Sequence, residues 1–332
     1  MKQRQGRNMD RYTFYVDDRQ GNIWQVRIIE AEWNTKQNGE AGKLSFSFIR
    51  DIDFDVLEGY VVRFDANDIP IFYGVIFDIK YDETEKGTAT AYDQLIYLTK
   101  HQASYVFENQ TASAILQAIC KDYNLDVGVI DPTAQPLTLV HQDKKLSDII
   151  RDALDRTTAA VRRLHTLYDD AGKVCLRELK NMMTDVVLAY GSLVTGYEYS
   201  RSISEDVYNN VRLIRKDEEK GVREVFVAKD HENIAKWGSL QYFATVDESL
   251  TDAQIQSRLQ LIMKLKNRTL RKLSTQSLGD YRARAGAMVY VEFEREKIGT
   301  WFLISEAQHK FENQLHTMKL TMFMPDAMEE KT

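Results

Sequence analysis

The sequence predicts a mainly β protein of the α+β class, with barrel-like or sandwich-like β regions, a small α+β unit and a helical segment. Two regions, near the two ends of the chain, alternate apolar and polar residues with the period of two that strands show. Between them, three stretches place apolar residues at the three-to-four spacing of amphipathic helices. Glycine-containing strand segments recur in both β regions and form a weak internal repeat.

The first β region runs from Tyr12 to Leu98. Short polar or glycine-containing turns separate its alternating segments, which are YTFYV, IWQVRII, KLSFSFI, YVVRF, IFYGVIF and GTATAYDQLIYL. Many short strands at this spacing are typical of a small β-barrel or sandwich. We expect the last segment to be a strand up to Leu98.

The period changes at Thr111, a residue type that is favoured at helix N-caps. The segments TASAILQAICKDY and KKLSDIIRDALDRT each place their apolar residues on one helical face. The strands AAVRRLHTLYD and KVCLREL then flank a turn at residues 169–172, which predicts a hairpin. We expect a small α+β unit that ends near Tyr190.

Strands return in NVRLIRKDEEKGVREVFVAKD, which predicts a hairpin with a charged tip at residues 217–221. Thr251 is a second N-cap candidate, and apolar residues follow it at helical spacing: Ile255, Leu259, Ile262, Met263 and Leu270. The last part of the chain, GAMVYVEFEREKIGTWFLISEAQHKFENQLHTMKLTMFM, reads as three strands separated by turns.

The internal repeat rests on four glycines. Gly59 begins one strand segment and Gly74 lies in the next, 15 residues later (74 − 59). Gly286 and Gly299 stand in the same order in the last region, 13 residues apart (299 − 286). The match is modest, but it predicts two β regions of similar design, with Gly59 and Gly286 at equivalent turns.

Composition excludes several classes of protein. Lys and Arg number 44 against 50 Asp and Glu, so the net charge of −6 provides no general attraction for nucleic acid. The two cysteines, Cys120 and Cys175, lie in apolar patterns and are expected to be buried thiols. No apolar run approaches the length of a membrane span, and no apolar region follows the basic start of the chain. We therefore expect no membrane anchor.

The stretch GTWFLISEAQHKFENQLHTMKLTMFM contains Glu306, His309 and His316, which raises the question of a metal or acid/base site. On a strand, alternation places Glu306 and His309 on opposite faces, and His316 falls on the next strand. A single pair of histidines falls short of the three or four ligands that zinc requires. We therefore interpret these residues as part of a β-sheet.

Two acidic patterns are also better explained by structure. Asp51, Asp53 and Asp55 resemble a calcium loop, but Val56 and Val62 stand where an EF-hand needs Gly and Glu. Glu292, Glu294 and Glu296 alternate along a strand, as glycosidase acids or a solvated sheet face would. GxSxG, HExxH, P-loop and GxGxxG motifs are missing from the sequence. We assign no catalytic, cofactor-binding or metal-binding residue and expect no cofactor.

The segment from Thr88 to Ile130 resembles the corresponding part of baseplate central hub proteins of contractile phage tails, the PBSX-type prophage hub family. The shared features in it are Ala91-Tyr92-Asp93, a strand end at Leu95–Leu98, Tyr105 with Phe107, Thr111-Ala112, and a helix that ends before Val127-Gly128. Later features are Asn210-Val211 at a strand start, Leu278-Gly279-Asp280, the Ala285-Gly286 turn, and His316-Thr317-Met318. The basic start MKQRQGR and Ala159-Ala160 depart from the family pattern.

The PBSX-type family is similar in fold to the hub proteins of the T-even and Mu phages. The resemblance implies a first tube-type barrel at 1–105, an α+β domain at 106–196, a second barrel at 197–230 and 276–325, a helical insert at 231–275 and a tail at 326–332. We expect the first and second barrels to have one strand order. A trimer in which each chain carries two such barrels would present six similar surfaces to a six-fold tube.

The same resemblance implies a function and partners. It implies a non-enzymatic baseplate hub of a phage tail or phage-tail-like bacteriocin, a homotrimer that joins the six-fold tail tube to the three-fold spike. The expected partners are the tube protein, the spike protein, other baseplate proteins and the tape-measure protein, without specific nucleic-acid binding. The protein would assemble in the bacterial cytoplasm and then reside in the baseplate. The alternative is a cell-wall-degrading hydrolase associated with the baseplate.

Overall fold

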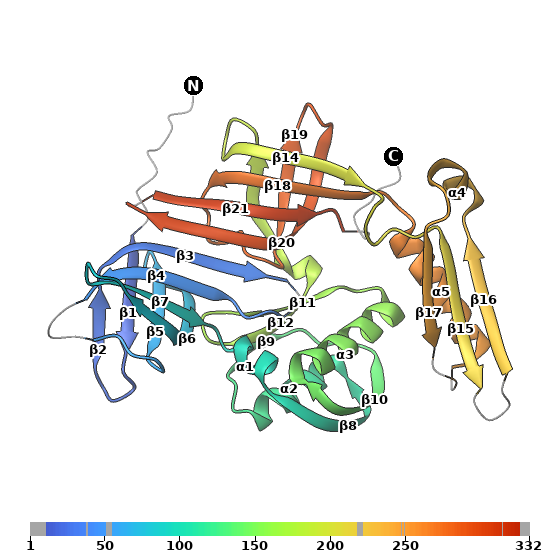
Figure 1. Ribbon diagram of the computed structural model, residues 1–332, viewed down its shortest axis with the longest axis horizontal. Coiled ribbons are helices and arrows are strands. Elements are labelled where there is room, and N and C mark those ends of the chain that lie inside the picture. The colour runs from blue at the N-terminus through green and yellow to red at the C-terminus, as the bar shows by residue number, and fades with distance from the viewer. Residues whose placement is uncertain are drawn as a thin grey trace. The chain divides into compact units, whose positions relative to one another are not determined.

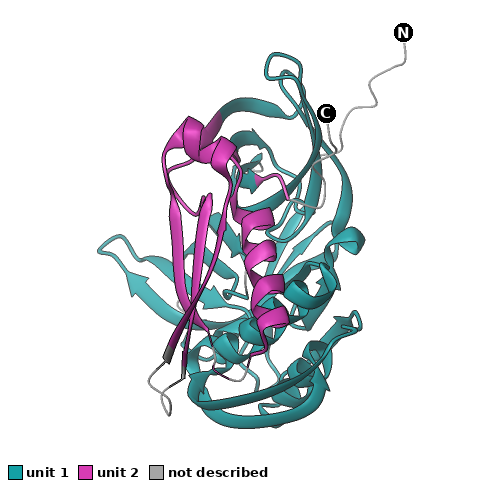
Figure 2. Ribbon diagram, turned by 90° about the vertical axis from the view of Figure 1, so that its right-hand side faces the viewer, with its two compact units in different colours: residues 1–198, 273–322 teal, residues 199–272, 323–332 magenta. Residues whose placement is uncertain are grey.

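The computed structural model describes residues 11–325 apart from 38, 51–54, 218–221, 247, 249 and 314. The chain divides into two compact units (Figure 2). Unit 1 comprises residues 1–198 and 273–322, and unit 2 comprises residues 199–272 and 323–332. Strands dominate the secondary structure and form four separate sheets among the described residues. The expected mainly β, α+β class is confirmed.

The first β region of unit 1 is an antiparallel arrangement of seven strands (Figure 1). The strands are β1 (Tyr12–Asp17), β2 (Ile23–Val26), β3 (Ile28–Lys36), β4 (Lys43–Ile49), β5 (Val61–Ala66), β6 (Ile69–Tyr81) and β7 (Lys86–Tyr92). Their order in the sheet is β2-β1-β5-β6-β7-β4-β3. Phe14 of β1 and Trp33 of β3 lie in one buried cluster although four strands separate β1 from β3. The sheet therefore curls around its apolar face.

The α+β part follows directly along the chain. Its elements are α1 (Leu95–Lys100), β8 (Gln102–Thr111), α2 (Ala112–Asp122), β9 (Val127–Ile130), β10 (Pro136–Lys145), α3 (Leu146–Val161), β11 (His165–Asp169), β12 (Val174–Glu178) and the 3-10 turn η1 (Leu179–Met182). β8 pairs with β10, and β12 pairs with both β11 and β9. Ile115 and Leu116 of α2 and Ile149 and Ile150 of α3 share one buried core with β8, β10 and β12. The apolar helical faces that the sequence predicts are confirmed.

The second β region supplies the rest of the largest sheet. Its strands are β13 (Met183–Ala189), β14 (Val194–Ser202), β18 (Leu270–Leu278), β19 (Met288–Phe293), β20 (Ile298–Glu312) and β21 (Leu315–Phe323). Their order is β13-β19-β20-β21-β18-β14. β20 is long enough to pair with β19 through its first half and with β3 through its second half. This pairing joins both β regions into one 13-stranded sheet.

The two β regions repeat one strand order. The first region without β2 and the second region each have six strands, which can be numbered 1 to 6 along the chain. In both regions the strands then lie side by side in the order 1-4-5-6-3-2, which is β1-β5-β6-β7-β4-β3 in the first and β13-β19-β20-β21-β18-β14 in the second. The two regions differ in the direction of their first pairing, because β1 is antiparallel to β5 whereas β13 is parallel to β19. The two regions therefore share one strand order apart from that difference in direction. The observed second region comprises β13, β14 and β18–β21, whereas the expected one included residues 210–229, which lie in another sheet.

The glycine turns follow the repeat in part. Gly59 and Gly286 precede β5 and β19, which are equivalent strands, and have φ values of +85° and +86°. Gly74 pairs across the sheet with Val62, whereas Gly299 pairs with Glu292 near the opposite end of β19. Gly59 and Gly286 are thus equivalent, and the predicted match of Gly74 with Gly299 is wrong.

The described strands do not close into barrels. The path of hydrogen-bonded strands through residues 11–325 has free ends, at β2 and β14, and β13 forms a further end beside β19. The expectation of two closed barrels is therefore wrong. Alternation shows that a segment is half buried, but closure depends on whether two distant strands meet, which no local pattern encodes.

Unit 2 is a three-stranded sheet with helices. Its own elements are β15 (Asn210–Asp217), β16 (Val222–Lys229), α4 (His231–Trp237), β17 (Gln241–Val246) and α5 (Asp252–Lys266). β15 lies between β16, which is antiparallel, and β17, which is parallel. Figure 2 shows α5 alongside this sheet, and Ile255 and Leu259 of α5 pack on Val211 and Leu213 of β15. The predicted hairpin at 210–229 is confirmed, but it pairs with β17 and not with the second β region.

Three local expectations need correction. Residues 95–98 lie in helix α1 and not in a strand. Directly before this helix, Asp93 Oδ1 accepts a hydrogen bond from the Leu95 N–H. Residues 159–161 continue α3, which ends at Arg162 with φ +56°, so the following strand is shorter than expected. Leu270 opens β18. The predicted caps are confirmed, since Thr111 and Thr251 both accept hydrogen bonds from the first turn of their helices.

Candidate functional site

The two histidines of the C-terminal strands lie next to each other in the interior of unit 1. His309 is on β20 and His316 on β21, and His309 Nδ1 lies 2.9 Å from His316 Nε2. His309 Nε2 lies 3.1 Å from the carbonyl oxygen of Ala283, and His316 Nδ1 lies 3.0 Å from the hydroxyl of Tyr12 on β1. These contacts form a continuous chain of hydrogen bonds from β1 to the segment before β19.

The chemistry of the end groups determines the direction of this chain. The Ala283 carbonyl can only accept, so His309 Nε2 carries a hydrogen and Nδ1 of the neutral ring accepts. His316 Nε2 must then donate to His309 Nδ1, which leaves His316 Nδ1 to accept from the Tyr12 hydroxyl. Both imidazoles are neutral in this arrangement, and all four of their ring nitrogens have partners.

Burial keeps both rings neutral. His309 is fully buried and stacks on Trp33, with ring centroids 5.1 Å apart. His316 stacks on Phe311 at 4.2 Å. Burial lowers the pKa of His309 to about 3, helped by repulsion from His316, and lowers the pKa of His316 to about 4. Both rings therefore lie in the interior of unit 1 and stay neutral at neutral pH.

Glu306 takes no part in this cluster. Its side chain is exposed and lies 3.6 Å from the Lys36 amine on the neighbouring strand. The expected opposition of Glu306 and His309 across the sheet is confirmed by their exposure and burial. Within the described ranges, no three His, Cys, Asp or Glu side chains gather in a way that could hold a metal ion. The histidine pair instead connects β1, β20 and β21 from within.

A second polar cluster lies between the α+β part and both β regions of unit 1. Asp93, which follows β7, accepts hydrogen bonds from the N–H of Gly42 at 2.7 Å and of Leu95 at 3.0 Å. Asp169 at the end of β11 accepts from the Gly172 N–H at 2.7 Å. Arg284, which precedes β19, donates to the Asp169 carbonyl at 2.6 Å. Segments far apart in the sequence are therefore joined by one buried group of charges.

Burial controls the ionisation of these two carboxyl groups. It raises the pKa of Asp169 to about 6, against the opposing effect of its hydrogen bond from Gly172. Burial and repulsion from Asp169 raise the pKa of Asp93 well above its usual value. Arg284 favours ionisation of both, and its guanidinium stacks 4.5 Å from the Tyr168 ring centroid. No local pattern predicts this cluster, because Asp93, Asp169 and Arg284 lie in three segments far apart in the sequence.

The remaining candidate residues are spread over the surface or buried singly. Glu292 and Glu294 are exposed, whereas Glu296 accepts a hydrogen bond from the Tyr197 hydroxyl at 2.6 Å. Asp55 contacts the Tyr81 hydroxyl at 2.7 Å, and the other two aspartates of that acidic run, 51 and 53, lie outside the described residues. None of these contacts pairs two carboxyl groups across a cleft.

The cysteines match their prediction. Cys120 on α2 and Cys175 on β12 are both buried and free. Burial raises the pKa of both thiols, that of Cys120 to about 11, so neither is a reactive thiolate at neutral pH. None of the described helices is long and apolar enough to cross a membrane.

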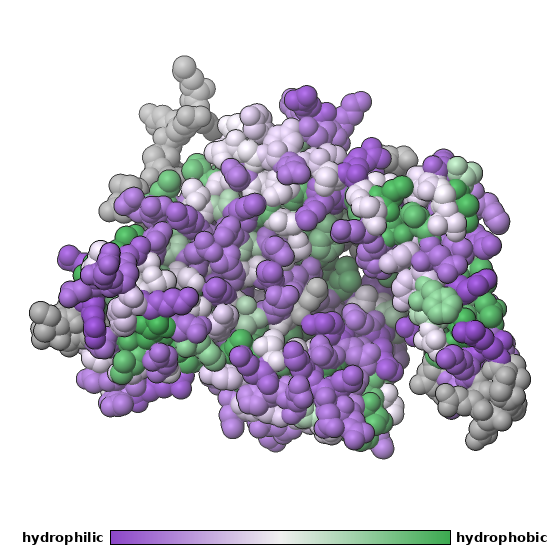
Figure 3. Space-filling view, in the orientation of Figure 1, coloured by the Kyte–Doolittle hydropathy of each residue, from purple (hydrophilic) through white to green (hydrophobic). Residues whose placement is uncertain are grey.

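Unit 2 carries an exposed apolar sheet face. Val225, Val227 and Phe243 are each more than 40% exposed, and Val227 and Phe243 flank Arg212 on the face opposite α5. Elsewhere on the face drawn in Figure 3, hydrophilic side chains cover most of the surface and hydrophobic ones form small patches.

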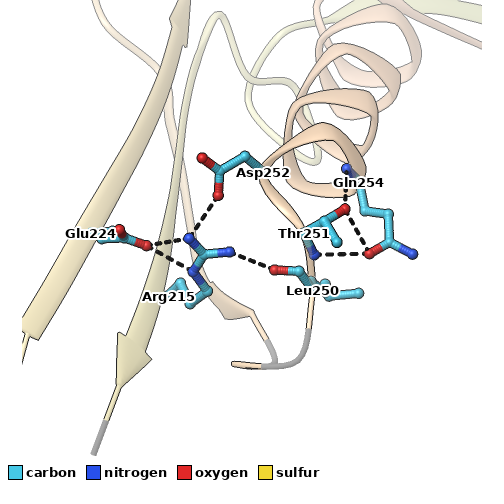
Figure 4. Close-up of polar contacts among 6 residues, drawn as sticks. All are labelled: Arg215, Glu224, Leu250, Thr251, Asp252 and Gln254. Carbon is cyan, nitrogen blue, oxygen red and sulfur yellow. Dashed lines mark hydrogen bonds and ion pairs between the residues drawn. The ribbon is translucent and has the colours of Figure 1, made fainter. Parts of the chain in front are cut away.

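A single arginine ties the sheet of unit 2 to its long helix (Figure 4). Arg215 of β15 donates to Glu224 of β16 at 2.8 Å, to the Leu250 carbonyl at 2.5 Å and to Asp252 of α5 at 2.6 Å. The same turn holds the capping box in which Thr251 and Gln254 satisfy the first amides of α5.

Comparison with known proteins matches this fold. The YQBQ-like family matches residues 31–323. Phage-like element PBSX protein XkdQ of Bacillus subtilis strain 168 is 31% identical over 307 residues, which cover 92% of this chain and 90% of that protein.

Two solved structures have the same fold at low sequence identity. The 43 kDa tail protein of prophage MuSo2 from Shewanella oneidensis superposes with a TM-score of 0.73 at 14% identity, covering 96% of this chain and 100% of that one. A tail protein from Neisseria meningitidis MC58 gives 0.72 at 11% identity, covering 94% and 96%. The chain therefore belongs to the YqbQ-like family of phage tail and baseplate structural proteins, in agreement with its resemblance to PBSX-type hub proteins.

Proposed function

We propose that this protein is the central hub of a contractile-tail baseplate, a homotrimer that adapts the six-fold tail tube to the three-fold spike. The observation that carries the proposal is the repeated strand order of the two β regions. A ring of three identical chains offers three copies of any one surface, but six similar surfaces when each chain contains the same β arrangement twice. Such a ring suits a six-fold neighbour on one side and a three-fold neighbour on the other.

The open sheet changes how the two halves would produce this symmetry. Closed barrels are not required for six similar surfaces, because equivalence depends on strand order and exposed faces. In both halves the fourth and fifth strands, β5 with β6 and β19 with β20, form antiparallel pairs after a left-handed glycine. We therefore base the proposed pseudo-six-fold symmetry on strand order alone.

The experiment combines a mass measurement with an image. Native mass spectrometry of the full chain alone should give three times the chain mass of 38.5 kDa, and its complexes with the tube and spike proteins should contain three copies of the chain. Low-resolution electron microscopy of the same particles should show a ring with three-fold symmetry and six similar lobes. A dimer, or a ring whose order is not a multiple of three in the presence of both partners, would contradict the proposal.

We further propose that the hub has no hydrolase activity of its own. Of the carboxyl groups considered for glycoside cleavage, Glu292 and Glu294 are exposed and Glu296 accepts a hydrogen bond from Tyr197, and the two histidines are held neutral in the interior. Purified protein should release no more product from bacterial cell wall than a heat-inactivated sample, with and without zinc. Turnover that Glu292→Gln or His309→Ala abolishes would favour the hydrolase alternative.

A further inference from the structure

A cleft opens in unit 1 between the first β region and the α+β part. Its volume is about 520 Å³, within the usual range for ligand sites. Four tyrosines contribute to its wall: Tyr73 of β6, Tyr92 of β7, Tyr97 of α1 and Tyr123 after α2. The His101 ring contacts that of Tyr123 in a tilted arrangement, with ring centroids 5.0 Å apart. The cleft is therefore lined by aromatic faces, which attract cations.

The charges of the cleft favour a cationic ligand. Asp122 and Asp126 line it, and no lysine or arginine of the described residues forms an ion pair with either one. Asp122 accepts a hydrogen bond from the Tyr105 hydroxyl at 2.8 Å, which fixes its position without neutralising it. Helix α2 ends at Asp122, so its negative dipole end also lies at the cleft. Arg19 is the one lysine or arginine in the described lining.

The chain itself contains a segment with the matching charge. Residues 1–10, which lie outside the described part, include Lys2, Arg4 and Arg7 and no acidic residue before Asp10. The protein as a whole has a net charge of −6, so this cluster of cations differs from the rest of the chain. The two glutamines between the cations, Gln3 and Gln5, add no charge.

The segment is also long enough to reach the cleft. Arg11 precedes β1 and Arg19 follows it by two residues, and the eight residue steps between them span at most about 26–29 Å. Lys2 is nine residues from Arg11, a reach of about 30 Å in an extended chain. An extended chain of this length therefore brings Lys2 as far as Arg19, whereas Arg4, seven residues from Arg11 or about 23–25 Å, needs the further length of its side chain.

We propose that the tyrosine-lined cleft binds the basic N-terminal segment of the same chain, with the Lys2 or Arg4 side chain between the aromatic rings and the carboxylates of Asp122 and Asp126. Binding of this kind combines charge attraction with cation–π contact. The proposal does not depend on the hub function proposed above.

Photocrosslinking of the full chain tests the proposal. Gln3 or Gln5 is replaced by p-benzoylphenylalanine, which retains all three cations, and heavy and light isotope-labelled chains are mixed before irradiation. We expect crosslinks to peptides that contain residues 92–101 or 122–126. The two crosslinked peptides should carry the same isotope label, because both come from one chain. Asp122→Asn with Asp126→Asn should reduce their yield at least tenfold, and Asn at 122 can still accept from Tyr105.

The matched control removes the same charge elsewhere. Glu108 of β8 and Glu292 of β19 are exposed carboxylates that do not line the cleft. Glu108→Gln with Glu292→Gln should therefore leave the crosslinking yield unchanged. Crosslinks that map outside the cleft, or equal yields in the two double variants, would overturn the proposal. Crosslinks between heavy and light chains would also overturn it, since the occupant would then be a second copy.

Discussion

Gly59 and Gly286 make the same backbone hydrogen bond in the two β regions. The Gly59 N–H donates to the Ile76 carbonyl at 2.9 Å, and the Gly286 N–H donates to the Ile304 carbonyl at 2.8 Å. Both glycines have positive φ, but their surroundings differ. An alanine Cβ at 59 would meet no atom within 4 Å, whereas one at 286 would overlap the Cγ2 methyl of Thr166.

This difference predicts unequal effects of one substitution. Gly59→Ala should lower the free energy of unfolding by about 1 kcal/mol, the cost of a left-handed L-residue. Gly286→Ala should cost roughly 1–3 kcal/mol more because of the overlap with Thr166. Urea unfolding of both variants measures the difference.

A double-mutant cycle isolates the overlap. Thr166→Ser removes the Cγ2 methyl, so it should recover part of the loss in Gly286→Ala and none in Gly59→Ala. Equal losses for the two glycine variants, or no recovery by serine, would contradict the packing of Gly286 against β11.

The histidine pair predicts a loss of stability in mild acid. The unfolded chain protonates histidines near pH 6.5, but the folded state keeps His309 and His316 neutral down to about pH 3 and 4. Their contribution is complete above pH 6.5 and decreases as the pH falls below it, by roughly 2 kcal/mol for each histidine at pH 5. Urea unfolding at pH 7.5 and pH 5 measures the change.

Comparison with a variant separates this effect from that of the buried aspartates. His309→Gln with His316→Gln has no imidazole to protonate, so its unfolding free energy should decrease less between pH 7.5 and pH 5 than that of the wild type. The same decrease in both proteins would show that the histidines are not held neutral.

Asp169 predicts the opposite dependence on pH. Its folded pKa of about 6 lies above the unfolded value of 3.8, so folding favours the protonated form. That stabilisation is full below pH 3.8 and is lost as the pH rises through 6, which leaves an ionised Asp169 that costs roughly 3 kcal/mol at pH 7.

Asp169→Asn should therefore raise the unfolding free energy by about 1 kcal/mol or more at pH 7, since the amide oxygen can still accept from Gly172. The gain should disappear at pH 4, where the wild-type carboxyl is neutral. Destabilisation of equal size at both pH values would mean that the negative charge of Asp169 supports the fold.

Arg215 predicts a local effect in unit 2. Arg215→Ala removes the bonds to Glu224, Leu250 and Asp252 together, so the first turns of α5 should exchange their amide hydrogens about tenfold faster. Hydrogen-exchange mass spectrometry measures this rate. Lys236→Ala is the control, because it removes an exposed pair with Glu232 inside α4. Unchanged exchange in α5 would contradict the role of Arg215.

Local patterns predicted most elements but few of their partners. Thr111 and Thr251 mark their helices because the capping contact lies within three residues of each. The hairpin 210–229 shows the same alternation whether it joins β17 or the second β region, so its partner could not be predicted. Tyr12 and His316 are 304 residues apart, and a buried contact over that distance leaves no signal in a single sequence.

The sharing of β20 between both β regions determines how the protein carries mechanical load. Seven residue pairs, from Glu306 with Lys36 to Glu312 with Glu30, connect β20 to β3, while the first half of β20 remains bound to β19. A force that pulls the two regions apart along this strand is resisted by many backbone hydrogen bonds in shear, which must yield together. Tension between the two regions would therefore load these hydrogen bonds together with the covalent connections of the chain.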